Sequence, residues 1–558
     1  MSTDIYISGS KHNIQLQIVG HLGLVGTFIR ESGIIKKIDS LLPKTSNHQG
    51  HFTHGEVVAL MILNGLGYTS KPLYMCHTYF ENKDVSAILG IEFRKEWFND
   101  DVIGRTMDAL YAYGLTDIFS QLSLEIMSYL GRKISTVNID STSFHYHGQE
   151  QKYDRSERFD YTVPHKINIT RGYSRDAHPE LVQIMEQMMV DNSTGIPLFM
   201  EPEDGNTNDT KAFRRMVQVF DRFKQYTDDG YVYLCGDAAL YSEGNIQEMD
   251  KLDIKYITRV ADGKIKCVQE FIAEHRDEEL EEIDDANQGK IYEIEHDGIK
   301  QKWLLVHSNT AEGRNEHSVM SRANKELENL EKELRKYTKT FYSCSPDAQK
   351  EINRITKKCK YCKVVNSEII AIEKGRPGRK PKNPKPDEPK EFQYQINITP
   401  AIDEEYCQTV MRNKSFFVIA TNDTERNWTS AELLKLYKTQ NRVERGFRFL
   451  KDPEFFADSI FVSKNEHMQA LLMIMTLSLA VFSGLEWKLQ NAMQETGTQL
   501  KNQLGKLQDK ITMRFVFQQF DGVITAIINN TDRYFDNIKE QPRKILKLLG
   551  KAYEDTYT

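Results

Sequence analysis

The spacing of apolar residues predicts that the chain begins with helices. Thr53 and Glu56 have the spacing of a helix-capping box just before an apolar run. Helical periodicity continues through residues 100–130, with one interruption at Gly114. Residues 1–130 are therefore predicted to form a compact N-terminal helical domain.

The pattern changes to short apolar and β-branched runs after residue 130. Strands are predicted at 133–140, 180–191, 196–200, 231–237 and 254–260, with a hairpin between the second and third and an amphipathic helix at 209–223. The predicted order is strand, strand, strand, helix, strand, helix, strand. Strands joined by helices indicate an α/β fold, in which a mixed sheet is covered by helices.

Residues 261–412 interrupt this pattern and are predicted to be an inserted domain. They contain a charged helix and a Pro/Gly/Lys-rich stretch at 373–390, where prolines every few residues exclude regular structure. The core pattern resumes over 413–490 with a strand at 415–423 and a single helix that Thr429 or Ser430 could cap. The remaining residues, 491–558, are predicted to be helical.

Composition narrows the class of protein. The chain has 558 residues, 39% of them hydrophobic, and a net charge of −7, which argues against a protein that coats nucleic acid indiscriminately. The charge is unevenly placed, because residues 262–300 hold 13 acids and 5 bases, whereas residues 321–390 hold 19 bases and 10 acids. This contrast suggests that the inserted domain has its own partner surface.

The chain is predicted to be cytoplasmic. Its seven cysteines are scattered, and its first residues lack the pattern of a signal peptide. The longest apolar run, Ala470–Leu485, has 16 residues, short of the roughly 20 that span a membrane. A buried core helix is expected there.

Two aspartates occupy the ends of predicted strands. Asp140 ends the run at 133–140, and Asp237 ends the run at 231–237. A single strand-end aspartate is most often a turn or cap residue. Carboxylates at neighbouring strand ends of one sheet can instead converge, and Mg²⁺ favours a small set of such oxygen ligands while keeping several waters.

A third carboxylate, Glu444, is surrounded by cations in YKTQNRVERGFRFLKD, residues 437–452. One interpretation is a solvated helix with side-chain pairs four residues apart. At about 100° per residue, however, four polar side chains lie within about 40° of Glu444, at the edge of a buried stripe. These are Tyr437, Gln440, Arg448 and Lys451. The arrangement favours a metal ligand beside a surface that binds a phosphate backbone.

Other signals are weaker. Residues 204–209 begin like a calcium loop but have Asp209 where glycine is needed. Cys359 and Cys362 form a lone CxxC pair without a second ligand pair. GRPGRKPK, with Arg376, Arg379 and Lys380, is similar to segments that enter AT-rich minor grooves, and a solvated Pro-rich linker explains it equally well.

Taken together, these motifs resemble those of the DDE transposases of bacterial insertion sequences. Asp140, Asp237 and Glu444 follow in the order strand, strand, helix. The insertion-sequence-four group carries Tyr, two residues, Arg, three residues, Glu, six residues, Lys, and Tyr437, Glu444 and Lys451 match that spacing. Gln440 stands where the arginine is expected, and Arg442 or Arg445 could make its phosphate contact instead.

The resemblance implies a fold and an activity. The fold would be a ribonuclease-H-like mixed sheet with flanking helices, split into 131–260 and 413–490 by the insertion domain, and an all-α N-terminal domain that binds DNA. Asp140, Asp237 and Glu444 would hold two Mg²⁺ ions, for which Mn²⁺ can substitute, during hydrolysis at the element ends and 3′-OH strand transfer. Residues contacting DNA would be Tyr437, Gln440, Arg442, Arg445, Arg448, Lys451, Arg376, Arg379 and Lys380.

The implied partners are the double-stranded inverted-repeat ends and the target DNA, which a homodimer would bring together at the bacterial nucleoid. No membrane partner is expected. Two alternatives remain open: a silent or regulatory relative that binds DNA ends, and a ribonuclease-H-like nuclease without strand transfer.

Overall fold

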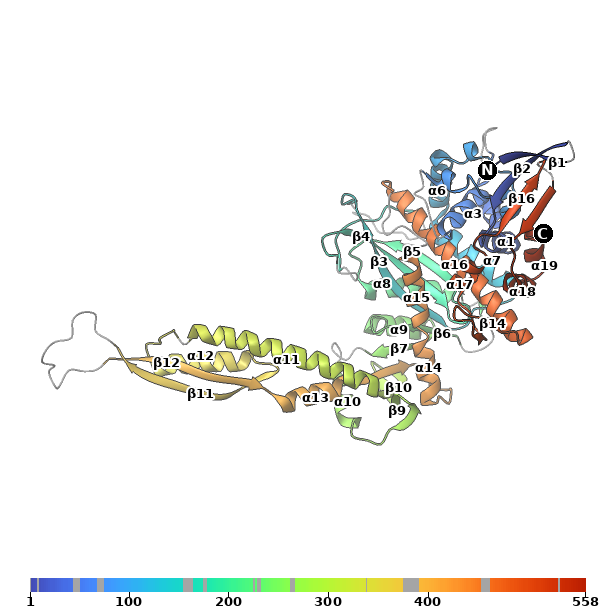
Figure 1. The fold of residues 1–558 in the computed structure, drawn as a ribbon. Coiled ribbons are helices and arrows are strands. Elements are labelled where there is room, and N and C mark those ends of the chain that lie inside the picture. Colours follow the sequence, from blue (N-terminus) through green and yellow to red (C-terminus); the bar gives the residue numbers. More distant parts are fainter. Residues whose placement is uncertain are drawn as a thin grey trace, which may run out of the picture.

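A nine-stranded mixed sheet runs through the body of the protein in the order β5-β4-β3-β6-β7-β13-β10-β9-β8 (Figure 1). In chain order its strands are β3 (Val137–Tyr146), β4 (Val182–Asp191), β5 (Pro197–Glu203), β6 (Tyr233–Gly236), β7 (Lys255–Val260), β8 (Glu281–Asp284), β9 (Asn287–His296), β10 (Ile299–Ser308) and β13 (Phe416–Thr421). β6 pairs in parallel with β3 and β7, and the other neighbours are antiparallel.

This computed structural model describes most of the chain. The described residues are 2–7, 10–43, 51–67, 75–153, 164–173, 178–223, 226–227, 232–260, 266–337, 339–374, 391–452, 462–529 and 532–558.

The predicted order of the first half of the sheet is confirmed. β3, β4 and β5 are followed by α8 (Asp209–Phe223), β6, α9 (Glu243–Lys251) and β7. β4 and β5 form the predicted antiparallel hairpin and are buried along their whole length. Because both faces of these strands are covered, even their polar residues, such as Gln187 and Glu186 of β4, are buried, and buried and exposed positions do not alternate.

The boundary of the inserted domain differs from the prediction. Strands β8, β9 and β10 fall within 261–412, yet they extend the central sheet through the pairing of β10 with β13. Trp303 lies opposite Ala420, and Val306 lies opposite Phe417. Because β10 and β13 are separated by a long stretch of chain, local periodicity does not reveal that they pair.

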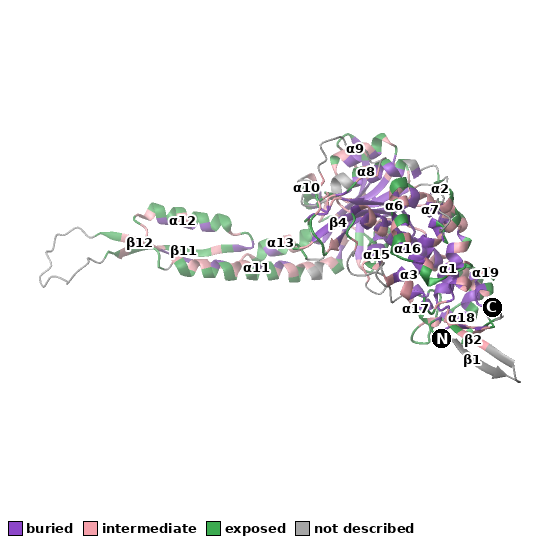
Figure 2. Cartoon of the chain, turned by 90° about the horizontal axis from the view of Figure 1, so that it is seen from above, coloured by how far each residue is buried: buried purple, intermediate pink, exposed green. Residues whose placement is uncertain are grey.

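The stretch of chain between β10 and β13 forms an arm that extends away from the body (Figures 1 and 2). It consists of α11 (Asn309–Tyr337), α12 (Ser345–Lys358), β11 (Cys362–Glu373), β12 (Phe392–Ile402) and α13 (Glu404–Lys414). A small apolar cluster that includes Leu330, Ile352 and Ile396 holds it together. Several arm cations pair with acids of the arm, such as Lys358 with Glu333 at 2.9 Å.

The predicted basic segment is not part of the described arm. Arg376, Arg379 and Lys380 lie outside the described residues. Their role in binding DNA stays a prediction from sequence.

Both ends of the chain contribute to a second sheet, which corrects the expectation of purely helical termini. Its order is β1 (Ser2–Ile7), β2 (Ser10–Ile18), β16 (Ile524–Ile528) and β17 (Asp532–Asp536). A short hairpin of β14 (Leu500–Lys501) and β15 (Leu507–Gln508) also lies in the region predicted to be helical. β2 pairs with β16, at the opposite end of the chain, so its strand state depends on a partner that sequence periodicity cannot identify.

The remaining N-terminal region is helical, as predicted. Thr53 and Glu56 form the capping box of α3, and Gly114, at a φ of 112°, separates α6 from α7. The helices are α1 (Leu22–Glu31), α2 (Ile34–Leu41), α3 (His54–Gly65), α4 (Cys76–Tyr79), α5 (Val85–Leu89), α6 (Asp100–Tyr113) and α7 (Leu115–Tyr129), with a 3-10 turn at Lys95–Trp97.

A long apolar helix, α16 (Asn465–Thr496), lies at the centre of the body against α1, α3, α6, α7 and β5. By length and composition it could cross a membrane, but 83% of its most apolar window is buried inside the protein. The expected core helix is therefore present. The other helices are α10 (Lys266–His275), α14 (Ser430–Lys438), α15 (Asn441–Leu450), α17 (Met513–Gln519), α18 (Glu540–Leu549) and α19 (Lys551–Thr556).

Candidate active site

Asp140 and Asp237 belong to two neighbouring strand segments of the central sheet, β3 and the end of β6. Asp237 directly follows β6, as predicted. Asp140 is the fourth residue of β3, which continues to Tyr146, so the prediction that Asp140 ends a strand is wrong. β3 and β6 pair in parallel with Asn138 opposite Cys235, and continuing that register by two residues places Asp140 level with Asp237. Neighbouring strands are about 4.8 Å apart, and residues in register project from the same face.

Local hydrogen bonds orient both aspartates. Oδ1 of Asp140 accepts from the backbone N–H of Ser141 at 2.7 Å, and Oδ1 of Asp237 accepts from the N–H of Ala239 at 2.8 Å. The hydroxyl of Thr258 on β7 donates to the carbonyl oxygen of Asp237 at 2.8 Å. Asp237 is therefore held in a turn whose position is fixed by the next strand of the sheet.

The segment predicted as one helix around Glu444 is two helices, which is a correction. α14 begins with a capping box between Thr429 and Glu432, and it ends at Lys438. A turn at Thr439 and Gln440 follows before α15 begins. No glycine or proline marks this break, so the helical pattern runs through it.

The break changes the predicted surface. Tyr437 belongs to α14 and packs beside the apolar cluster that contains Tyr233 and Trp428. Gln440 is only 9% exposed. Tyr437 and Gln440 are therefore packed against the body, whereas Glu444 is exposed on α15.

Two contacts fix α15 along β3. The hydroxyl of Thr439 lies 3.2 Å from Oδ1 of Asn138, and Nζ of Lys451 lies 5.9 Å from the ring centroid of Phe144. Asn138, Asp140 and Phe144 are alternate residues of β3, so they share one face of the sheet. Glu444 lies between the two contacts along α15, as Asp140 does along β3.

The contact of Arg442 with Ser193 indicates which flank of α15 carries Glu444. Arg442 lies on one flank and donates to the carbonyl oxygen of Ser193, in the connection between β4 and β5, at 3.4 Å. Glu444 follows by two residues, about 200° around the helix axis, so it lies on the opposite flank. Since the sheet order is β4-β3-β6, that flank faces the side of Asp140 and Asp237.

The buried face of α15 is closely packed. A Cβ atom added at Gly446 would lie 3.1 Å from the side chains of both Leu479 on α16 and Met188 on β4. Met188 is the residue paired with Asp140. Glycine at this position thus lets α15 approach the strands next to the candidate site.

Leucine at Gly446 is expected to lower the free energy of unfolding by about 1–3 kcal/mol, because it overfills this contact. Alanine is the matched control, since the two neighbouring atoms are ends of flexible side chains that can move by a few tenths of an ångström. Thermal unfolding of Gly446→Leu and Gly446→Ala measures the difference. Equal melting temperatures for the two variants would show that α15 is not closely packed against β4 and α16.

The three carboxylates themselves are not gathered into one ligand set. Within the described ranges, no three His, Cys, Asp or Glu side chains lie close enough together to hold a metal ion. Asp140 and Asp237 are half-buried and Glu444 is exposed. Like charges repel at short range, so separated side chains are the expected arrangement of three carboxylates that share one face.

The cations predicted to contact DNA differ in accessibility. Arg442, Arg445 and Arg448 are exposed, whereas Lys451 is half-buried against Phe144. Burial raises the pKa of Glu486 on α16, and the positive charges of Arg442 and Arg445 partly oppose this rise. The exposed side of α15 is therefore strongly cationic.

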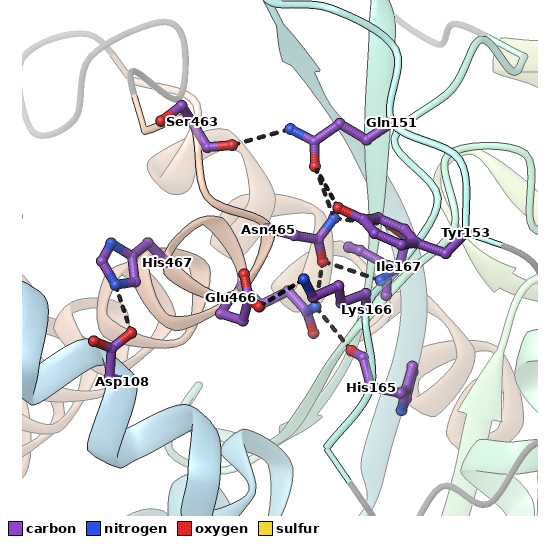
Figure 3. Close-up of polar contacts among 11 residues, drawn as sticks. Asp108, Gln151, Tyr153, His165, Lys166, Ile167, Ser463, Asn465, Glu466 and His467 are labelled. Carbon is purple, nitrogen blue, oxygen red and sulfur yellow. Dashed lines mark hydrogen bonds and ion pairs between the residues drawn. The ribbon is translucent and has the colours of Figure 1, made fainter.

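A polar network that the sequence did not predict fixes the start of α16 (Figure 3). Asn465 accepts from the N–H of Ile167 at 3.1 Å and donates to its carbonyl oxygen at 2.8 Å. Lys166 pairs with Glu466 at 3.0 Å, and His467 lies 2.7 Å from Asp108. No sequence signal pairs these residues, because they come from three distant segments.

Comparison with known families identifies two regions of the chain. Residues 131–481, more than half of the chain, match the model described as a transposase DDE domain. Residues 14–124 match a domain of unknown function, DUF4277. A search of curated proteins finds no match.

Two solved structures show limited similarity. One is a piggyBac transposase synaptic complex with hairpin DNA, at a TM-score of 0.37 and 11% identity, covering 90% of this chain and 79% of that chain. The other is a Mos1 transposase paired-end complex with the left transposon end, at a TM-score of 0.14 and 13% identity, covering 37% of this chain and 58% of that chain. Both TM-scores are too low to support a residue-by-residue correspondence.

Proposed function

Because the chain belongs to the transposase DDE domain family, we propose that it catalyses cut-and-paste transposition of a bacterial insertion sequence. The family is one of enzymes that cleave DNA and transfer strands. The finer assignment is to the insertion-sequence-four group, acting on DNA at the nucleoid. The Tyr437, Glu444 and Lys451 spacing supports it.

The observation that carries this proposal is the parallel pairing of β3 with β6, because that register, continued by two residues, brings Asp140 level with Asp237. The Glu444 flank of α15, opposite the contact of Arg442 with Ser193, supports the proposal. Two aspartates and one glutamate offer only oxygen ligands, which is the donor set that Mg²⁺ prefers. The residues present therefore fit the proposed ion by chemistry. Asp140, Asp237 and Glu444 would hold it, and Mn²⁺ could replace Mg²⁺.

When bound, two Mg²⁺ ions would activate the attacking oxygen and stabilise the leaving 3′ oxygen. The protein's own residues would perform the binding and orientation. Asp140 and Asp237 would fix the reacting phosphate relative to the sheet, since strand pairing and backbone hydrogen bonds orient both side chains. Glu444 would close the site from α15.

The exposed arginines of α15 would hold the DNA backbone. Arg445 and Arg448 lie within about 100° of Glu444 around the helix axis, and Arg442 is exposed on the opposite flank of α15. Arginine suits this role because its planar donors match phosphate oxygens. Lys451 would contribute from its position above Phe144.

A joining assay tests the proposal. The purified chain is incubated with Mg²⁺, a labelled pre-cut transposon end and a supercoiled target, after the inverted repeats are identified in the DNA flanking the gene. Joined products are expected, and a homodimer is expected in the complex that holds two ends. Cleavage without joining would indicate a nuclease, and end binding without either reaction would indicate a silent relative.

A further inference from the structure

The hairpin of β14 and β15 presents an apolar residue at its tip. Leu504 is 79% exposed and Leu507 is 60% exposed. Turns between strands usually carry polar residues, so a leucine at the most exposed point of a tight turn needs an explanation. The hairpin lies on the body beside α18 (Figure 1).

The hairpin is held rigidly by hydrogen bonds. The backbone N–H of Asn502 donates to the carbonyl oxygen of Lys506 at 2.9 Å. The side-chain oxygen of Asn502 accepts from the N–H groups of Leu504 at 2.9 Å and Lys506 at 3.0 Å. Gly505 donates to the carbonyl oxygen of Asn502 at 2.9 Å and takes a φ of 73°. This three-residue turn ends in a left-handed glycine, and it fixes the direction of Leu504.

The base of the hairpin is attached to the body. Gln541 of α18 accepts from the N–H of Lys501 at 3.0 Å and donates to its carbonyl oxygen at 3.0 Å. Leu500 is buried, and Gln499 donates to Asp509 at 2.8 Å. Leu504 thus projects from a hairpin whose base is fixed to the body by hydrogen bonds and by burial.

The surface around the tip is positively charged. Lys501, Lys506 and Lys510 are exposed along the hairpin, against one acid, Asp509. Glu540 is close enough to Lys501 for the lysine to lower its pKa, although its first partner is Lys544. Lys506 and Lys510 leave the tip flanked by positive charge.

We propose that this hairpin is a DNA wedge, in which Leu504 inserts between base pairs of duplex DNA while the three lysines contact the flanking phosphates. Apolar residues that enter a base step unstack and bend the duplex, and lysines supply the sequence-independent attraction. The inference rests on the proposed function, since it requires a chain that binds DNA. It adds a contact surface outside the Asp140, Asp237 and Glu444 site.

Fluorescence of 2-aminopurine in a duplex of about 40 base pairs tests the wedge, because unstacking a base increases its emission. Several duplexes carry the probe beside TA or CA steps, which deform most easily. The full-length chain is used with Ca²⁺ in place of Mg²⁺, so that binding is measured without cleavage. The wild-type chain is expected to raise the fluorescence of at least one duplex.

Leu504→Ala is expected to abolish this rise and to weaken binding about tenfold, since it removes the inserted side chain. Its salt dependence should stay unchanged. Lys501, Lys506 and Lys510 changed together to Gln are expected to reduce the slope of log Kd against log salt by up to about 3. Tyr534→Ala, which removes another exposed side chain (58% exposed) on β17, is the matched control and should behave as wild type.

Several results would overturn the wedge. One is unchanged fluorescence and affinity in Leu504→Ala with an unchanged melting temperature. Others are Leu504-dependent binding to vesicles of anionic phospholipid, or Leu504-dependent self-association in sedimentation, with no effect on DNA. A chain that binds no duplex at all would instead reject the proposed function. Normal joining activity together with a wild-type response of Leu504→Ala rejects the wedge alone.

Discussion

The Asp237→Asn variant is expected to bind a transposon end but to lose nicking in Mg²⁺ by at least about a thousandfold. Asparagine keeps the size of the side chain and can accept the N–H of Ala239, so the turn after β6 should persist. It removes one negative charge from the proposed ligand set, and metal-assisted charge stabilisation supplies several kcal/mol of the lowered barrier. Asp140→Asn and Glu444→Gln should have the same effect.

The measurement combines a gel assay for nicking with a separate assay for end binding. Glu425→Gln is the matched control, because Glu425 is exposed and lies outside the proposed site. It should nick at the wild-type rate. Nicking by Asp237→Asn at a rate within tenfold of wild type would remove Asp237 from the proposed ligands.

Glu186→Gln is expected to stabilise the protein at pH 8 but not at pH 4.5. Glu186 is fully buried on β4, where Thr142 of β3 is its paired residue. Its Oε1 lies 2.5 Å from the hydroxyl of Thr476, which also lies 2.9 Å from the carbonyl oxygen of Leu472. One hydroxyl proton cannot serve both acceptors, so a proton on Glu186 completes the arrangement.

Burial raises the pKa of Glu186 from 4.5 to about 8. Below pH 4.5 the group is protonated in both the folded and the unfolded chain. Between about pH 4.5 and 8 the unfolded chain loses this proton while the folded chain keeps it, so the free energy of unfolding falls as the pH rises. Glutamine removes this loss, which is on the order of 4 kcal/mol at pH 8.

Melting temperatures of the wild type, Glu186→Gln and Glu425→Gln across this pH range test the expectation. The gap between Glu186→Gln and the wild type should widen as the pH rises, while the exposed control follows the wild type. A gap that does not depend on pH would mean that Glu186 is ionised in the folded protein.

Local signals predicted the elements of the fold better than their assembly. The strands and helices between 131 and 260 follow from their periodicity, and the capping boxes at Thr53 and Thr429 follow from short side-chain spacings. The break before α15 could not be predicted, because the contact made there joins Thr439 to Asn138, which lies 301 positions away in the sequence. The pairing of β2 with β16 is missed for the same reason.

The candidate site shows the same division. Predicted strand ends pointed to Asp140 and Asp237, although only Asp237 follows the end of a strand, and cation spacing pointed to Glu444. The parallel pairing of β3 with β6 and the contact of Arg442 with Ser193 are both tertiary, so the sequence could not predict them. The burial of Gln440 and the packing of Tyr437 also depend on tertiary contacts, which a helical wheel does not describe.

The way the arm joins the body makes it a separable module. It leaves at the end of β10 and returns at the start of β13, and these two strands are antiparallel neighbours. The N–H of Ser308 donates to the carbonyl oxygen of Ser415 at 2.9 Å, so the chain is already closed at the point where the arm begins. A turn of a few residues could span the same gap. Evolution could therefore lengthen, exchange or delete residues 309–414 as a single unit, with the register of the central sheet left intact.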